Sequence, residues 1–208
     1  GPAAMQRYHP SKYRTARAAL KTVTAPPPGT TVIPSVLLAQ AVWLCGEIAK
    51  HDEARELLTG DGWNEDTFLW TDPATGLACK ARIDRVCIDE TDGQLRVPAI
   101  VDIKTTSGGC GERAFSRAVQ DYGYDVSAAH YLAGFEAVLG VRPPFHWIVV
   151  ESQTGAVAVH RADVGLIEWA ESRRQRMLAT LAECIKSDRW PMPAGSVIER
   201  PRWAKELS

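Results

Sequence analysis

The first third of the chain carries apolar residues at helical spacing. From residue 35 to residue 58 they return every three or four positions, which predicts a helix with Ser35 as its N-cap behind Pro34. A short second turn begins at Asp52, and glycines at 60 and 62 end the helical region. The predicted apolar stripe comprises Leu38, Val42, Cys45, Ile48 and Ala49.

The next stretch has the composition of β-strands. Residues 66–71 are rich in aromatic and β-favouring side chains and precede a turn signal at 72–76, so residues 77–88 are predicted to form the partner strand. After a second turn near Gly93, the β-branched run 99–105 predicts a third, short strand.

The second half alternates helices and strands more coarsely. Residues 115–139 have a helical pattern that is expected to break near Gly123 and to end at Gly140. Residues 145–151 and 156–161 are predicted strands, and Asp163 is the predicted N-cap of a helix reaching about residue 187. This order predicts an α/β or α+β sandwich with a central sheet. The expected apolar face of the last helix comprises Leu166, Trp169, Ala170, Arg173, Met177, Leu181 and Cys184.

Charge adds a separate N-terminal segment to this picture. The 208 residues contain 24 Lys and Arg against 25 Asp and Glu, yet the first 46 residues hold five basic and no acidic side chains. Residues 1–29 are therefore predicted to be a basic arm with a proline-rich hinge, and residues 30–208 a single domain. The arm suits nucleic-acid phosphates and equally a solvated tail. Residues 1–4, ahead of Met5, resemble a cloning remnant.

Composition also excludes several classes of protein. No apolar run reaches the roughly 20 residues of a membrane helix, so no membrane partner is expected. The five cysteines are odd in number and form no CxxC pair, which argues against a disulfide framework or a zinc ribbon. With a polar, basic N-terminus in place of a signal peptide, the sequence predicts a cytoplasmic protein.

Acidic residues around the third predicted strand are the candidates for chemistry. Asp102 and Lys104 alternate on this strand and so share a face, while Ile103 is expected to point into the core. Asp84 lies on the preceding strand, and Glu65 comes just before the first strand. Carboxylates without His or Cys suit Mg²⁺ or Mn²⁺, and a lysine beside them can orient water for phosphodiester hydrolysis. A structural salt bridge would give the same Asp and Lys spacing.

Three sequence runs, in this order, resemble the RecE-like (exonuclease VIII-type) exonucleases of phages and prophages: TGLACKARID at 75–84, VDIKTT at 101–106 and YGYDVSAAHY at 122–131. These exonucleases belong to the PD-(D/E)xK nuclease superfamily. The resemblance extends from about residue 36 to residue 203. It implies a restriction-endonuclease-like core, in which a central mixed sheet is flanked by helices.

The resemblance also implies an activity and a site. The activity is Mg²⁺-dependent degradation of linear duplex DNA from its ends, 5′ to 3′, in phage-type recombination, with Mn²⁺ as a substitute ion. Glu65, Asp84, Asp102 and the Ile103 carbonyl would hold the metal, and Lys104 would position the attacking water. Tyr131 matches the family's helix tyrosine, whereas Ser127 stands where the family usually has glutamine.

Partners and alternatives follow from the same resemblance. A single-strand annealing protein and a ring-shaped homo-oligomer are expected. Some nucleases of this superfamily carry an iron–sulfur cluster, but none is expected here because the cysteines include no closely spaced trio. A catalytically weak module that binds DNA ends, or an endonuclease of the same superfamily, would carry the same residues.

Several basic and aromatic residues near the predicted site are candidates for DNA contact. Arg82 and Arg85 flank Asp84, and Arg113 and Arg117 follow the third strand at helical spacing. Because arginine binds phosphate in bidentate fashion, these four suit DNA, although ion pairs with nearby acids would explain them equally. Two tryptophans that flank Glu65 could stack on bases, and one histidine beside Tyr131 is either packed or a ligand. These three residues are Trp63, Trp70 and His130.

Overall fold

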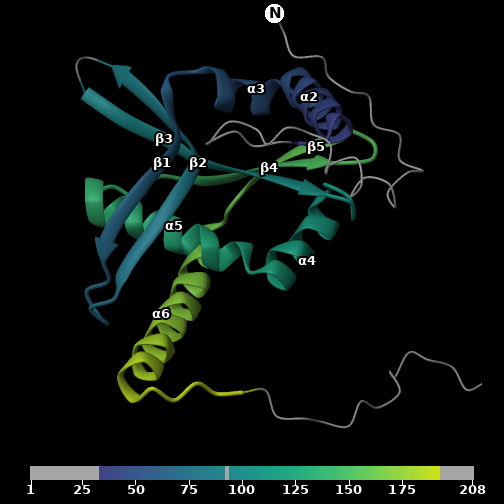
Figure 1. Ribbon diagram of the computed structural model, residues 1–208. Coiled ribbons are helices and arrows are strands. Elements are labelled where there is room, and N and C mark those ends of the chain that lie inside the picture. The colour runs from purple at the N-terminus through teal and green to yellow at the C-terminus, as the bar shows by residue number, and fades with distance from the viewer. Residues whose placement is uncertain (1–32, 92–93, 193–208) are drawn as a thin grey trace, which may run out of the picture.

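The computed structural model describes residues 33–91 and 94–192, which form a five-stranded sheet with helices on both faces (Figure 1). The predicted basic arm and hinge at 1–29 lie outside the described residues. The strands are β1 (Gly62–Thr71), β2 (Ala78–Thr91), β3 (Gln94–Thr106), β4 (Phe145–Glu151) and β5 (Val157–Arg161). The helices are α2 (Ser35–Lys50), α3 (Asp52–Thr59), α4 (Glu112–Tyr122), α5 (Tyr124–Leu139) and α6 (Val164–Ser187).

The sheet is mixed, as predicted. Its strands follow in the order β1-β2-β3-β4-β5, and every neighbouring pair is antiparallel except β3 and β4. A parallel pair needs a long crossover connection, which α4 and α5 provide between the two strands. The end of β3 therefore passes directly into the loop that begins α4.

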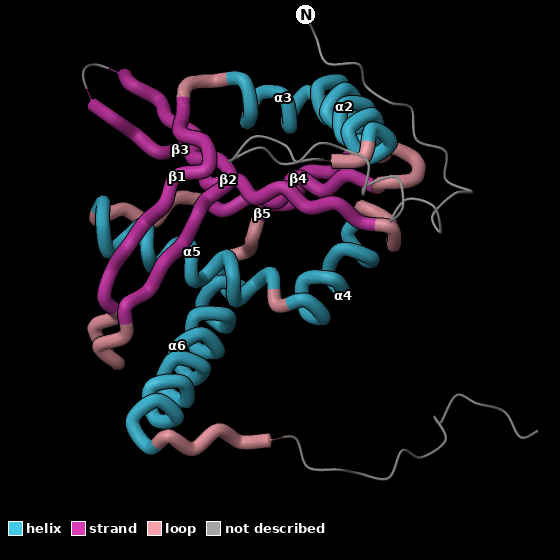
Figure 2. Tube along the Cα trace, viewed as in Figure 1, coloured by secondary structure: helices cyan, strands magenta, loops and turns pink. Residues whose placement is uncertain are grey.

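Two hydrophobic clusters hold the helices on opposite faces of the sheet (Figure 2). On one face α2 and α3 contribute Leu44, Ile48 and Ala54, which pack against Val101 and Ile148. On the other face α4, α5 and the start of α6 cover the larger cluster. The fold is thus a helix–sheet–helix sandwich, which confirms the predicted class. None of the helices in the described part of the chain combines the length and apolar composition that a membrane crossing needs.

Helix boundaries were easier to predict than helix faces. Asp163 caps α6 as expected, since its side chain accepts hydrogen bonds from the backbone N–H groups of Gly165 and Leu166. The predicted Ser35 cap is wrong, because Pro34 occupies the N-cap position of α2 and no side chain bonds there.

The predicted apolar stripes are also wrong in part, because several of their residues lie on exposed faces of the helices. Val42 in α2 is 65% exposed and Met177 in α6 is 59% exposed. Trp169 and Leu181 in α6 are exposed as well.

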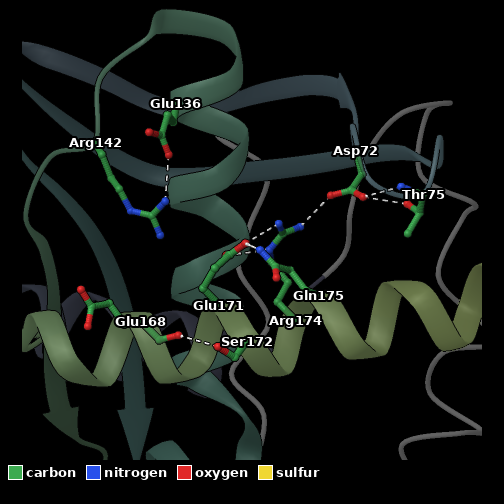
Figure 3. A network of polar contacts seen from close by, with 9 residues as sticks. All are labelled: Asp72, Thr75, Glu136, Arg142, Glu168, Glu171, Ser172, Arg174 and Gln175. Carbon is green, nitrogen blue, oxygen red and sulfur yellow. Dashed lines mark hydrogen bonds and ion pairs between the residues drawn. The ribbon is translucent and has the colours of Figure 1, made fainter.

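A buried ion-pair network fastens the β1–β2 turn to α6 (Figure 3). Arg174, 6% exposed, reaches Asp72 at 3.4 Å and Glu171 at 2.6 Å. Asp72 also accepts hydrogen bonds from the backbone and the side chain of Thr75, which shapes the turn. Although burial raises the pKa of Asp72, these hydrogen bonds and the Arg174 charge hold it below its usual range. This network therefore fixes the turn of the β1–β2 hairpin, whose strands carry Glu65 and Asp84.

Candidate active site

The strand register places the three acidic candidates in one row across β1, β2 and β3. Glu65 lies between two registered pairs, Asn64 with Arg85 and Asp66 with Ile83, and so stands opposite Asp84. The last registered pair of β2 with β3 joins Arg85 to Val101, so Asp84 faces the position of Asp102 one residue further on. In contrast to the prediction, Glu65 lies within β1 and not before it.

Asp84 and Asp102 meet at the point where the pairing of β2 with β3 ends. The backbone N–H of Ile103 donates a hydrogen bond to Oδ2 of Asp84 at 2.9 Å. The side chain of Ile103 is 37% exposed, which contradicts the prediction that it points into the core. Because the N–H and C=O of one strand residue face the same neighbour, the Ile103 carbonyl also faces the Asp84 side.

Burial makes the Asp102 carboxylate electrostatically costly. Asp102 is 4% exposed, and this burial raises its pKa above the usual value for an aspartate. The Lys104 ammonium opposes that rise, whereas the nearby Asp84 charge adds to it. Two carboxylates whose charges repel in a poorly solvated place form a site that a cation would stabilise.

Lys104 is held between a carboxylate and an aromatic ring. Its ammonium forms an ion pair with Asp102, and Nζ lies 5.0 Å from the centre of the Tyr124 ring. The Lys104 side chain is 21% exposed, so part of it still faces solvent. The sequence left open whether Asp102 and Lys104 form a structural salt bridge or a catalytic pair. Both interpretations refer to this one ion pair, which lies at an accessible place.

Glu65 adopts a conformation that is uncommon for a residue other than glycine. Its φ is 57°, in the left-handed region, and its carboxylate forms an ion pair with Arg82 at 2.8 Å. Within the described part of the chain, no three His, Cys, Asp or Glu side chains are arranged closely enough to hold a metal ion. By strand register, Glu65 therefore lies in the same row as Asp84 and Asp102. Its side chain does not form a metal-sized cluster with theirs.

The donor set nevertheless fits a hard divalent cation. Mg²⁺ in proteins is usually held by one or two carboxylates, with water and substrate phosphate completing its shell. Asp84, Asp102 and the Ile103 carbonyl would be the oxygen ligands of such an ion, and Glu65 could be added only by releasing Arg82. The arrangement therefore suits Mg²⁺ better than a thiophilic metal.

Tyr131 and Ser127 lie one turn apart on α5. Burial raises the pKa of the Tyr131 phenol, and the nearby charges of Asp102 and Asp84 raise it further. The hydroxyl therefore stays protonated. Ser127 is exposed, and its hydroxyl lies 3.3 Å from the Gly123 carbonyl oxygen, to which it donates. Ser127 is thus occupied within its own helix.

The four candidate arginines have different environments. Arg85 is 4% exposed and donates to the backbone carbonyls of Leu57, Gly60 and Asp61. It is therefore buried structural support and not available to phosphate, in contrast to the prediction. Arg82 is exposed but paired with Glu65, and Arg113 and Arg117 are exposed on α4. Of these two α4 residues, Arg117 lines the groove beside Lys104.

The aromatic candidates chosen from the sequence serve the core. Trp63 packs at the edge of the larger hydrophobic cluster. Trp70 lies 4.7 Å from the His130 ring, centroid to centroid, and covers Gly134 so closely that a Cβ there would clash with it. His130 is packed in this contact, with its Nε2 3.3 Å from the Lys80 carbonyl oxygen. All three side chains thus have packing contacts within the fold.

Sequence reasoning missed the groove and the tyrosines that line it. The groove, about 310 Å³, runs from Lys104 along the loop after β3 to the corner between α4 and α5. Tyr122 and Tyr124 line it on either side of Gly123, whose φ of 67° ends α4 and starts α5. The sequence marked this Tyr-Gly-Tyr segment as a helix break and as the start of the run 122–131 that resembles RecE-like exonucleases, but not as the wall of a groove.

Comparison with known families assigns residues 38–199 to one family. Residues 38–199 match the family described as a PDDEXK-like domain of unknown function (DUF3799). The chain belongs to this family. The match runs from within α2 past the end of α6, and it confirms the PD-(D/E)xK-like character expected from the sequence.

One solved structure supports the same fold for this DUF3799 domain. A presumed exonuclease from Eubacterium rectale superposes with a TM-score of 0.50 at 16% identity, covering 76% of this chain. The DUF3799 chain spans 63% of the length of that protein. The structure of SSO0001 aligns over 82% of this chain and 68% of its own, with a TM-score of 0.41 and 18% identity. No curated protein is similar enough in sequence to count as a relative.

The raised pKa of Asp102 leads to a prediction about stability. In metal-free buffer at neutral pH, Asp102→Asn is expected to raise the melting temperature, by about 2–4 °C for each kcal/mol of relieved burial cost. A group whose pKa is raised on folding favours the folded state at low pH and disfavours it once pH exceeds that pKa. The difference from wild type should therefore disappear as pH falls.

Calorimetry between pH 4 and 8 would measure this effect, with Glu136→Gln as the control. Glu136 is a surface carboxylate whose side chain is 49% exposed, so its substitution should leave the melting temperature nearly unchanged at every pH. A lower melting temperature for Asp102→Asn at neutral pH would contradict the prediction and show that the ion pair with Lys104 outweighs the burial cost.

Proposed function

We propose that this protein is a nuclease that hydrolyses DNA phosphodiester bonds with the help of a divalent cation. The observation that carries the proposal is the placement of Asp84, Asp102 and Lys104. Two carboxylates and an ammonium meet at an accessible position of a PDDEXK-like sheet. The sequence pattern and the tertiary arrangement thus point to the same three residues.

Each side chain has a defined task in this proposal. Asp84, Asp102 and the Ile103 carbonyl hold the cation, which when bound supplies Lewis acidity and charge neutralisation at the scissile phosphate. Lys104 orients the attacking water, because its ammonium is fixed by Asp102 and by the Tyr124 ring. The protonated Tyr131 hydroxyl can donate a hydrogen bond to the phosphate or to water beside the carboxylates.

The finer proposal is an exonuclease that acts on the ends of linear duplex DNA, 5′ to 3′, with Mg²⁺ as the natural ion. Its support is the ordered resemblance to RecE-like exonucleases and the fold shared with a presumed exonuclease. A role in phage-type recombination, a single-strand annealing partner and a ring-shaped assembly belong to the same proposal. So do the division into a basic arm and one domain, and the DNA contacts of Arg82, Arg113, Arg117 and Ser127.

A second candidate function is a module that binds DNA ends but hydrolyses them slowly. The ion pair between Glu65 and Arg82 favours it, because the third carboxylate is already engaged by a cationic side chain. Ser127, which bonds within its own helix, offers little to compensate. An endonuclease of the same superfamily is the other alternative, and it differs in its substrate.

One experiment separates these candidates. Purified protein is incubated with end-labelled linear duplex and with closed circular duplex, each in Mg²⁺ and in EDTA. An exonuclease should release labelled nucleotides from the linear DNA in Mg²⁺ alone and leave the circles intact. Cutting of circles would indicate an endonuclease. Retention of both DNAs without cleavage, with metal-independent binding, would indicate the binding module and overturn the proposal.

A further inference from the structure

The groove beside Lys104 includes Lys104, Tyr124 and Arg117, which have roles above, but most of its lining has none. It is lined by the end of β3, the loop that follows, and the corner of α4 and α5, with a volume of about 310 Å³. Its walls combine polar and aromatic groups, among them Thr106, Ser107, Arg117 and Tyr122. Sites for small ligands usually have about 300–1,000 Å³, so this groove has room for one nucleotide and not for a duplex.

Tyr122 is the exposed end of a stack of aromatic rings. Its side chain is 71% exposed, and its ring lies 5.5 Å from that of Tyr124 at an interplanar angle of 28°. Tyr124 stacks in turn on Phe115, with ring centres 6.1 Å apart at 29°. Phe115 is 3% exposed and stacks on His160 at 5.1 Å and 13°. The core thus supports a tyrosine that presents a large apolar ring to solvent.

The same stack is joined to the proposed catalytic lysine. The Tyr124 ring that supports Tyr122 also lies 5.0 Å from Nζ of Lys104. Arg117 is exposed on the α4 side of the groove, and the salt bridges found among the described residues do not include it. A nucleotide with its base on Tyr122 would therefore have Lys104 and Arg117 available for its phosphates. Asp121 also lines the groove and would repel a phosphate, which favours the Lys104 side for the anion.

We infer that this groove binds a single unpaired nucleotide at the end of a DNA strand, with its base stacked on Tyr122. The inference rests on the proposed function and deepens it by naming the form of the substrate. A base inside a duplex has both of its faces covered by neighbours, so it must leave the stack before it can lie on a protein ring. The protein should therefore prefer ends whose terminal base is frayed or mismatched. Stacking accepts any base, so little sequence preference is expected.

The test places the fluorescent base 2-aminopurine at either terminal nucleotide of a linear duplex. Wild type in Ca²⁺, used to allow binding without turnover, should quench this fluorescence at one end. Tyr122→Ala should lose the quenching and raise KM in Mg²⁺ by about 5- to 150-fold, the range of one stacked base, with kcat little changed. Tyr122→Phe should behave as wild type, and Tyr122→Leu, which keeps apolar bulk without an aromatic face, should behave as Tyr122→Ala.

The control is Trp190→Ala, which removes an exposed aromatic side chain that follows the C-terminal end of α6. It should change neither quenching nor KM. Equal quenching and equal KM for wild type and Tyr122→Ala would overturn the inference while leaving the nuclease proposal intact. Conversely, Tyr122-dependent quenching in a protein that releases no nucleotides would support the nucleotide site and overturn the proposed hydrolysis.

Discussion

Replacing Lys104 with alanine is expected to lower kcat for DNA hydrolysis by about 10²–10⁴-fold, the usual contribution of a positioned proton-transfer or water-orienting group. The ammonium is fixed on one side by Asp102 and on another by the Tyr124 ring, so no neighbouring cation can replace it without moving. KM should change by less than tenfold, because Arg117 and the rest of the groove remain. Single-turnover kinetics on end-labelled duplex in Mg²⁺ would measure both.

Two further variants sharpen this prediction. Lys104→Arg should recover little activity, because a planar guanidinium cannot occupy the place of a compact ammonium between carboxylate and ring. Lys186→Ala, which removes a lysine from the last turn of α6, should retain wild-type kcat. A Lys104→Ala protein with kcat within threefold of wild type would show that the ion pair with Asp102 is structural only.

Replacing Arg174 with methionine is expected to lower the free energy of unfolding by about 3–5 kcal/mol, the cost of removing one partner from a buried ion pair. Asp72 is 3% exposed and would remain buried, with only the Thr75 hydrogen bonds to balance its charge. Glu171 would lose its contacts with Arg174 at the same time. Urea denaturation at pH 7 would give the value.

The matched control is Arg142→Met, since Arg142 pairs with Glu136 in the same region but at the surface (Figure 3). Exposed pairs contribute about 0–1 kcal/mol, so this variant should unfold almost as wild type does. The pKa of Asp72 lies below its usual range in the folded protein, so the contribution of its ionised form is present at neutral pH and lost in acid. The Arg174→Met deficit should therefore shrink at low pH, and equal deficits for the two arginine variants would refute the assignment.

Local patterns were sufficient for the elements that local chemistry specifies. The alternation of residues 99–105 predicted a strand with Asp102 and Lys104 on one face, and the two lie within ion-pair distance. Gly123 and Gly140 were predicted to end helices, and both adopt left-handed conformations at C-cap positions. These features depend on neighbours in sequence, which is why they could be predicted without the fold.

Other features depended on distant segments and were predicted wrongly. Arg85 was expected to contact DNA because it lies beside Asp84, but carbonyl groups of the loop after α3 surround it. Ile103 was expected in the core, but β2 separates from β3 at that point and leaves it partly exposed. Trp63 and Trp70 were the expected stacking residues, but Trp63 packs against the larger hydrophobic cluster and Trp70 packs on α5. Tyr122 is the exposed ring instead.

The sequence by itself determined the order of elements, the superfamily and the identity of the Asp84, Asp102 and Lys104 set. Side-chain periodicity and turn chemistry act over a few residues, so they can be recognised in the sequence alone. The tertiary structure alone decided that Glu65 pairs with Arg82, that Arg85 is buried and that a tyrosine stack continues from Lys104 into solvent. Each of these features depends on strand register and on the packing of the crossover helices, which bring together residues far apart in sequence. Register and packing of this kind produce no local sequence pattern.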